Sequence, residues 1–252
     1  MIRQGESTSK KVANTTAQTN EVQTTKTKVE KTKKEGKKQD AKASFNEAYA
    51  KNLPDAVKEK LKKAAADKKA VNIVIVGGKV SLPAKDALVS KFVYNLDASY
   101  GKGLWNVMVN EYKNESTEEL IANKRAQDIA KENPDVMLFE APFIIDNNKT
   151  GNGNSVANAQ KFVGELSSSA KDATIMIQPS NPVYGAKNYP KAIEALKQFA
   201  TQNGYTYVDH WGAWPDATTK AILPYLQEEF GFPSAKGHEV LTQYVTDYFV
   251  AK

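Results

Sequence analysis

The run Val71-Asn-Ile-Val-Ile-Val-Gly77 decides the fold, and a second glycine follows it at position 78. Its residues are apolar and mostly β-branched, without the polar alternation of a strand that has one face in water. Such a run is typical of a strand buried on both faces, as in parallel sheets that are covered by helices. The run therefore predicts an α/β fold.

Alternating strands and helices follow this run. Strands are predicted at 104–112, 135–141, 173–178 and 205–209, and helices at 83–99, 116–133, 155–171, 189–203, 216–229 and 234–250. Ser116 and Glu119 have the spacing of a capping box, and Gly204 suits the left-handed residue that ends a helix. The alternation predicts a three-layer, flavodoxin-like, five-stranded parallel sheet of order 2-1-3-4-5 with right-handed crossovers.

The residues before the first strand divide into two parts. Residues 1–42 have almost no large apolar side chains and are rich in Lys, Thr, Gln and Glu, which predicts a disordered tail. Residues 43–69 are predicted to form a helical lead-in, with Pro54 at the start of a second helix. Its apolar residues recur at i, i+4 spacing: Phe45, Tyr49, Leu53, Val57 and Leu61. Residues 70–252 then form the α/β domain.

Charge and composition narrow the classes of partner. The net charge of +6 is concentrated in the tail, which indicates either attraction to an anionic envelope polymer or a solvated tether. The lysines have no interleaved aromatic residues to stack on bases, so no nucleic-acid partner is predicted. The absence of cysteine excludes disulfides and cysteine metal sites. No run reaches the ~18 apolar residues of a membrane helix, although the tail resembles a stalk that follows an anchor.

The loops after the strands are the expected place of function, because ligands of such sheets bind beyond the carboxyl ends of the strands. The first loop contains Gly78, Lys79 and Ser81, but it lacks the glycine–lysine spacing of a nucleotide P-loop. Ser81 is a candidate nucleophile and equally a candidate helix cap. No cofactor is predicted.

The second and third loops contain polar residues that suit an oxyanion site. Asn114 follows the second strand, and Asp146 and Asn147 follow the third. Asparagine amides can hold an oxyanion, but all three residues also suit turns. Their spacing is not that of a calcium loop, and no metal is predicted.

The fifth loop begins with His210, which two tryptophans, Trp211 and Trp214, follow closely. Tryptophans of this kind form either a platform for carbohydrate or part of the core. The other histidine of the chain is His238, near the start of the last helix. Histidine chemistry therefore depends on His210 or His238.

These features together resemble SGNH (GDSL-type) hydrolases. The resemblance rests on the order of elements, the Val-Gly end of the first strand, the run Pro134-Asp-Val-Met-Leu-Phe-Glu140, and Phe232-Pro-Ser-Ala-Lys-Gly-His238. Tyr207-Val-Asp-His-Trp-Gly-Ala-Trp-Pro-Asp216 looks like a stretch of the cell-surface SGNH proteins of Gram-positive bacteria. The resemblance covers residues 72–252 and implies the flavodoxin-like sheet and ester-hydrolase chemistry.

In that family a Ser after the first strand attacks an ester or amide carbonyl. Its own amide, a Gly after the second strand and an Asn after the third hold the oxyanion, and a His in the last loop activates the Ser. That His lies three residues beyond an Asp. The resemblance thus implies a role for one residue of each loop.

This chain departs from the family pattern at each of these positions. The nucleophile falls at Gly78 or Lys79, the oxyanion Gly near Asn114, and the Asn-Asp pair at Ile145 and Asp146. The base falls at Phe232, and its carboxylate partner at Glu229. His238 corresponds to the helix residue after a Gly, not to the base. Loss of the nucleophile or of the base lowers the rate by orders of magnitude.

Two functions stay open. The first is a degenerate, non-catalytic module that binds a cell-envelope glycan or a partner through Lys79, Asn147, Trp211 and Trp214. The second is an active esterase or deacetylase that acts on an acylated cell-wall polysaccharide, with Ser81 as nucleophile and His210 or His238 as base. Both predict a place outside or on the surface of a Gram-positive bacterium, while a cytoplasmic place stays open.

Overall fold

The computed structural model describes residues 25–28, 45–77, 87–149, 151, 153–229 and 231–251. The run that opens the domain forms the central strand β2, and the side chains of Ile73, Val74, Ile75 and Val76 are fully buried. The strands are β1 (Thr25–Lys28), β2 (Val71–Gly77), β3 (Trp105–Glu111), β4 (Val136–Glu140), β5 (Thr174–Gln178) and β6 (Thr206–Tyr207).

The sheet confirms the predicted topology. Its order is β1-β3-β2-β4-β5-β6, and β2 to β6 pair in parallel. These five strands have the order 2-1-3-4-5 when they are counted from β2. The strand β1 pairs antiparallel with β3, with Thr25 opposite Glu111. This edge strand is not predicted from the sequence, and the rest of the segment 1–44 lies outside the described residues.

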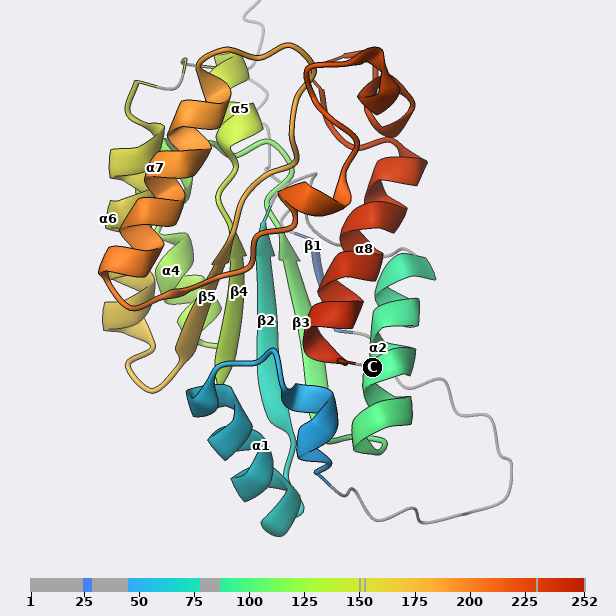
Figure 1. Ribbon diagram of the computed structural model, residues 1–252. Helices are drawn as coiled ribbons and strands as arrows, with labels where there is room; N and C mark the ends of the chain where they lie inside the picture. Colours follow the sequence, from blue (N-terminus) through green and yellow to red (C-terminus); the bar gives the residue numbers. More distant parts are fainter. Residues whose placement is uncertain are drawn as a thin grey trace, which may run out of the picture.

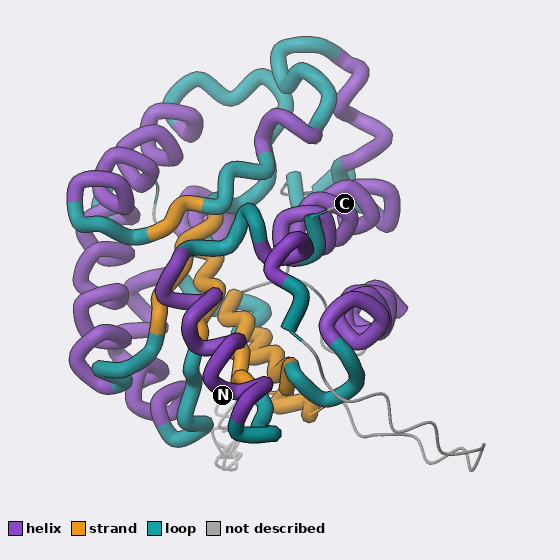
Figure 2. The backbone as a smooth tube through the Cα atoms, turned by 60° about the horizontal axis from the view of Figure 1, so that its bottom comes forward, coloured by secondary structure: helices purple, strands orange, loops and turns teal. Residues whose placement is uncertain are grey.

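Helices cover both faces of the sheet (Figures 1 and 2). The helices α2 and α8 pack together on one face, and α6 packs with α3, α4 and α7 on the other. The helices are α1 (Asp55–Ala66), α2 (Ala87–Tyr100), α3 (Thr117–Ala122), α4 (Arg125–Ala130), α5 (Phe143–Lys149), α6 (Ser155–Ser169), α7 (Tyr189–Gln202) and α8 (Ala235–Phe249), with short 3₁₀ helices η1 (Glu47–Ala50), η2 (Trp211–Ala213) and η3 (Lys220–Tyr225). The described part of the chain contains no helix that is both long and apolar enough to cross a membrane.

The lead-in covers the end of the sheet that is opposite to the loops of interest. Figure 1 shows α1 beside the amino-terminal ends of the strands. The Lys60 ammonium donates to the carbonyls of Asp135 and Asp172, which precede β4 and β5. The amide of Ala251 donates to the carbonyl of Tyr49, which joins η1 to the end of the chain (2.8 Å). The carboxyl ends of the strands are therefore left to the loops.

Two predicted helices differ from the structure. The helix predicted at 116–133 divides into α3 and α4, because Lys124 has a left-handed backbone (φ 55°). The division lets Arg125 form a bidentate ion pair with Glu115 (2.5 and 3.0 Å). The helix predicted at 216–229 is replaced by turns and η3, which contains Pro224, a residue without an amide donor.

Candidate functional site

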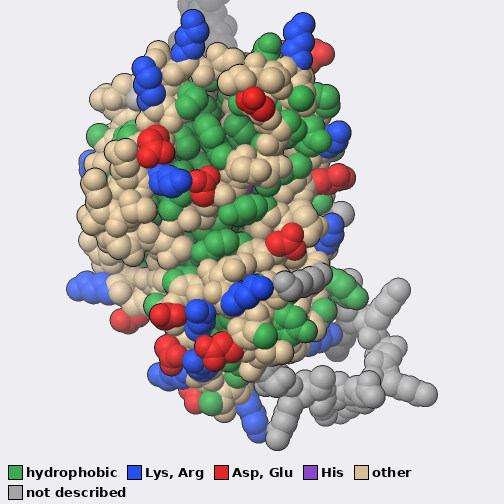
Figure 3. All heavy atoms as spheres, viewed as in Figure 1, with side chains coloured by type: hydrophobic (Ala, Val, Ile, Leu, Met, Phe, Trp, Pro, Cys, Tyr) green, Lys and Arg blue, Asp and Glu red, His purple; other side chains and the backbone are tan. Residues whose placement is uncertain are grey.

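The candidate site lies at the carboxyl ends of the parallel strands. Figure 3 shows hydrophobic side chains gathered toward this end of one face, whereas charged side chains crowd the opposite end, where α1 lies. Three predicted site residues of the first loop, Gly78, Lys79 and Ser81, lie outside the described residues. Most of the remaining predicted residues fall into two groups on this edge, and Phe232 and His238 lie near the start of α8.

The first group surrounds the start of α3. Asp146 is 2% exposed, and its two carboxylate oxygens accept from the amide and the hydroxyl of Thr117 (both 2.8 Å). Burial raises the pKa of Asp146, while hydrogen bonds from Thr117 and Ser155 oppose this increase. Because its oxygens hold the first turn of a helix, Asp146 supports the local fold directly.

The two asparagines near Asp146 are exposed. Asn114 precedes the capping box of Ser116 and Glu119, and its carbonyl accepts from Lys149. Lys149 also pairs with Glu119 (2.7 Å). Asn147 lies on α5, a helix where the sequence predicts a loop. These contacts connect α3 to α5 and place both asparagines at the surface.

The second group is centred on His210, which is fully buried. Its Nδ1 accepts from the indole Nε1 of Trp214 (3.0 Å), so the ring proton is on Nε2, which donates to the carbonyl of Pro179 (2.8 Å). Burial lowers the pKa of His210 to about 4. Both ring nitrogens are therefore engaged inside the protein, and the imidazole links the loop after β5 to the loop after β6.

The tryptophans are held in place by the same two loops. The indole Nε1 of Trp211 donates to the carbonyl of Ser180 (2.8 Å), and the ring stacks on Tyr189 with centroids 6.0 Å apart. Trp211 is partly exposed, while Trp214 is 7% exposed. The structure thus brings His210, Trp211 and Trp214 together, as their closeness in sequence allows.

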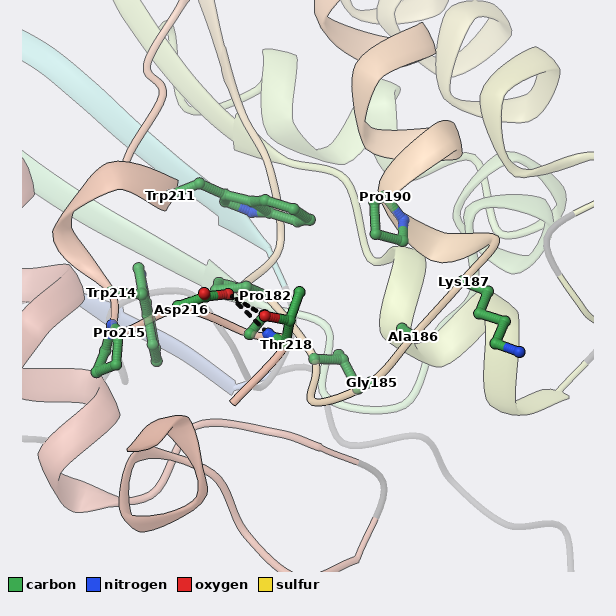
Figure 4. Close-up of a pocket in the computed structure, with 12 residues that line it drawn as sticks. Pro182, Gly185, Ala186, Lys187, Pro190, Trp211, Trp214, Pro215, Asp216 and Thr218 are labelled. Carbon is green, nitrogen blue, oxygen red and sulfur yellow. Dashed lines mark hydrogen bonds between the residues drawn. The ribbon is translucent and has the colours of Figure 1, made fainter. Parts of the chain in front are cut away.

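A pocket of about 540 Å³ lies between these two loops (Figure 4). Its walls include Pro182 and Pro190, which follow β5, and Pro215, which follows Trp214. Few polar groups line it. The lining residues are Pro182, Val183, Gly185, Ala186, Lys187, Pro190, Trp211, Trp214, Pro215, Asp216, Ala217 and Thr218. Most of them were not predicted, because only the tertiary fold places the loop at 182–190 against the loop at 211–218.

The position of the family base is occupied by an apolar side chain. Phe232 is 5% exposed and precedes α8. The carbonyl of its neighbour Gly231 accepts from the side-chain amide of Asn181 (3.0 Å). His238 is half-buried on α8, and the Gly237 before it has no room for a side chain, since an added Cβ would be 2.2 Å from the carbonyl oxygen of Tyr225.

A buried polar pair at the ends of β4 and β5 was not predicted. Glu140, at the end of β4, is fully buried, and the Ser180 hydroxyl lies 2.6 Å from its Oε1 and 2.7 Å from the carbonyl oxygen of Ala141. Burial, and the nearby Glu140 charge, raise the pKa of Tyr189, whose hydroxyl donates to the carbonyl of Asn181 (2.9 Å). A polar residue at the end of an otherwise apolar strand was the signal available in the sequence. No cluster of metal-ligating side chains occurs within the described ranges.

Comparison with known proteins extends these observations. No protein-family model and no curated protein matches the chain in sequence. Solved structures do match: the acetylxylan esterase Axe2 of Geobacillus stearothermophilus has a TM-score of 0.57 at 14% identity, over 72% of this chain and 94% of that chain. A protein described as a GDSL-like lipase, from Parabacteroides merdae, has a TM-score of 0.58 at 9% identity over 72% and 96%. The α/β hydrolase LAE5 from a Lake Arreo metagenome has a TM-score of 0.56 at 14% identity over 72% and 96%.

These identities are low, and the likeness therefore concerns the fold. It extends over nearly the whole length of each matched protein, and it agrees with the strand order and with the helices on both faces of the sheet. The α/β domain of this chain has the SGNH (GDSL-type) hydrolase fold.

Proposed function

We propose that this domain is a non-catalytic SGNH-like module that binds a cell-envelope glycan or a partner through the loops at the carboxyl ends of its strands. The observation that carries the proposal is the pocket between the loops after β5 and β6. Its described lining contains two tryptophans but no serine, cysteine or histidine. Such a pocket is equipped to hold a ligand and lacks the side chains that activate a nucleophile.

Two further features support the absence of turnover. The side chain at the family's base position is the buried Phe232, which cannot take up a proton. His210 is engaged at both ring nitrogens, and acting as a base would require it to lose the hydrogen bond from Trp214. We assign His210 to the support of the pocket.

The alternative is an esterase or deacetylase that acts on an acylated cell-wall polysaccharide. The fold likeness to an acetylxylan esterase favours it. Ser81 would then be the nucleophile, and His238 would be the base. A location outside the cell or on its surface suits both functions and is part of the proposal.

Hydrolysis of p-nitrophenyl acetate and of acetylated xylo-oligosaccharides distinguishes the two. We expect the wild type, Ser81→Ala and His238→Gln to hydrolyse the substrates at equal rates, each close to the uncatalysed rate in buffer. If Ser81→Ala lowers a measurable wild-type rate by about 10³-fold or more, the module is catalytic and the proposal is wrong. Thermal unfolding of each variant shows that the fold is retained.

A further inference from the structure

We infer that the pocket between the loops at 182–190 and 211–218 binds a neutral oligosaccharide, with one sugar ring stacked on Trp211 and a hydroxyl donating to Asp216. This inference rests on the proposed binding function, because it names the ligand class of that site.

Hydrogen bonds between the two loops hold the pocket in its formed shape. The amide of Gly185 donates to the carbonyl of Ala217 across the two loops (3.0 Å). The side chains of His210 and Trp211 donate to the carbonyls of Pro179 and Ser180, the residues that lead into the loop at 182–190. A ligand therefore finds a formed surface and orders little of the protein when it binds.

Trp211 forms a supported aromatic wall of the pocket. Tyr189 does not line the pocket and stacks on the indole, which supports the ring from outside the pocket. Figure 4 shows the indole as a flat wall above Asp216 and Thr218. A rigid, partly exposed aromatic face with polar groups opposite it matches a sugar ring, which has an apolar C–H face and a rim of hydroxyls.

Asp216 gives the pocket a fixed negative charge. The Asp216 Oδ1 accepts from both the amide and the hydroxyl of Thr218 (both 2.8 Å), which fixes the carboxylate and leaves Oδ2 to accept from a ligand. Those bonds lower the pKa of Asp216, so it is ionised at neutral pH. Lys187 is the positively charged residue among those that line the pocket, and its side chain extends away from Asp216 in Figure 4. A carboxylate facing the pocket repels an anionic ligand and accepts from a hydroxyl.

The volume sets the length of the bound segment. About 540 Å³ is within the ordinary range of small-molecule sites, and it suits a short segment of a chain more than a single ring. We therefore expect hexasaccharides to bind more tightly than the corresponding monosaccharides.

The test is calorimetry on the full chain with cellohexaose, xylohexaose and N-acetylchitohexaose, and with an anionic galacturonate hexamer. We expect a Kd of roughly 1 mM or tighter for at least one neutral hexamer, and weaker binding of the anionic one. Trp211→Leu and Asp216→Asn should each weaken binding by about tenfold, while Trp211→Phe should retain a larger part of it.

Matched controls come from other faces of the molecule. Tyr94→Ala removes an aromatic side chain that is 72% exposed on α2, and Asp67→Asn changes an exposed carboxylate at the end of α1. Neither should change the Kd. The inference is wrong if no neutral hexamer binds, if the anionic hexamer binds more tightly, or if Asp216→Asn and Trp211→Leu bind like the wild type. Turnover that depends on Ser81 would instead overturn the proposed function and leave this pocket in place.

Discussion

At the scale of single residues, His210 shows how a reactive residue type becomes a structural one. The ring is fully buried, donates from Nε2 to Pro179 and accepts at Nδ1 from Trp214. A protonated imidazole has no acceptor, so protonation would break the bond from Trp214. Burial of the ring and the bond from Trp214 therefore favour the neutral imidazole, while the bond to Pro179 opposes them.

This arrangement predicts a loss of stability in acid. Burial lowers the pKa of His210 to about 4 in the folded state, whereas the ordinary value is 6.5. Below pH 6.5 the unfolded chain binds a proton that the folded chain does not bind, so stability falls with pH until about pH 4. The total effect is roughly 3 kcal/mol. Urea unfolding at pH 7, 6, 5 and 4 measures it.

His210→Gln is the comparison for that experiment. Its amide can donate to Pro179 and its carbonyl can accept from Trp214, but it does not titrate. The free energy of unfolding of the variant should therefore fall less between pH 6.5 and 4. Identical slopes for the two proteins would show that His210 does not cause the pH dependence.

At the scale of elements, the start of α3 is held by side chains on both sides. Ser116 and Glu119 form the predicted capping box, and Asp146 of α5 accepts twice from Thr117. The capping box could be predicted from the sequence, because its two residues are only three positions apart. The contact from Asp146 spans 29 residues, and only the packing of α5 against α3 reveals it.

Asp146→Asn tests this role against a role in ligand binding. The variant presents an amide donor to the Thr117 donors, so we expect the free energy of unfolding to fall by about 1–3 kcal/mol, with no change in glycan affinity. Asn148→Ala, at an exposed position on the same helix, should remain within about 0.5 kcal/mol of the wild type. A loss of affinity without a loss of stability would place Asp146 in the binding site.

At the scale of the whole molecule, the lead-in is part of the domain. Ala50, Val57 and Leu61 are fully buried in the common core. Lys60 closes the amino-terminal end of the sheet, and Tyr49 pairs with the end of the chain. The lead-in helices therefore pack into the same hydrophobic core as the α/β domain.

Leu61→Ala should lower the free energy of unfolding by about 2–5 kcal/mol, because it leaves a cavity between α1 and the sheet. Lys63→Ala, an exposed change on the same helix, should have an effect within about 0.5 kcal/mol. Chemical unfolding measures both. If the two variants are equally stable, the lead-in does not contribute to the core of the domain.

The sequence by itself determined most of the elements and the order of the parallel strands. Some signals act over only a few residues, so the sequence alone shows them. They include the apolar β-branched run at 71–77, the capping box at Ser116, and Gly204 with its left-handed backbone (φ 72°). The parallel order 2-1-3-4-5 followed from the alternation of strands and helices. The break at Lys124 was not legible, because it accompanies the pairing of Arg125 with Glu115. The loss of the predicted helix at 216–229 did have a local signal, Pro224, which has no amide donor.

Only the tertiary structure decided what the polar residues of the loops do. His210, Trp211 and Trp214 stand together in sequence, but their bonds to Pro179 and Ser180 and the opposing wall at 182–190 come from another part of the chain. Asp146 and Glu140 likewise owe their surroundings to residues 29 and 40 positions away. The partners, exposure and pKa of a side chain depend on the residues that the fold packs against it, and these can be distant in sequence. The order of elements follows from local patterns and can be predicted, whereas the site depends on such distant contacts and cannot.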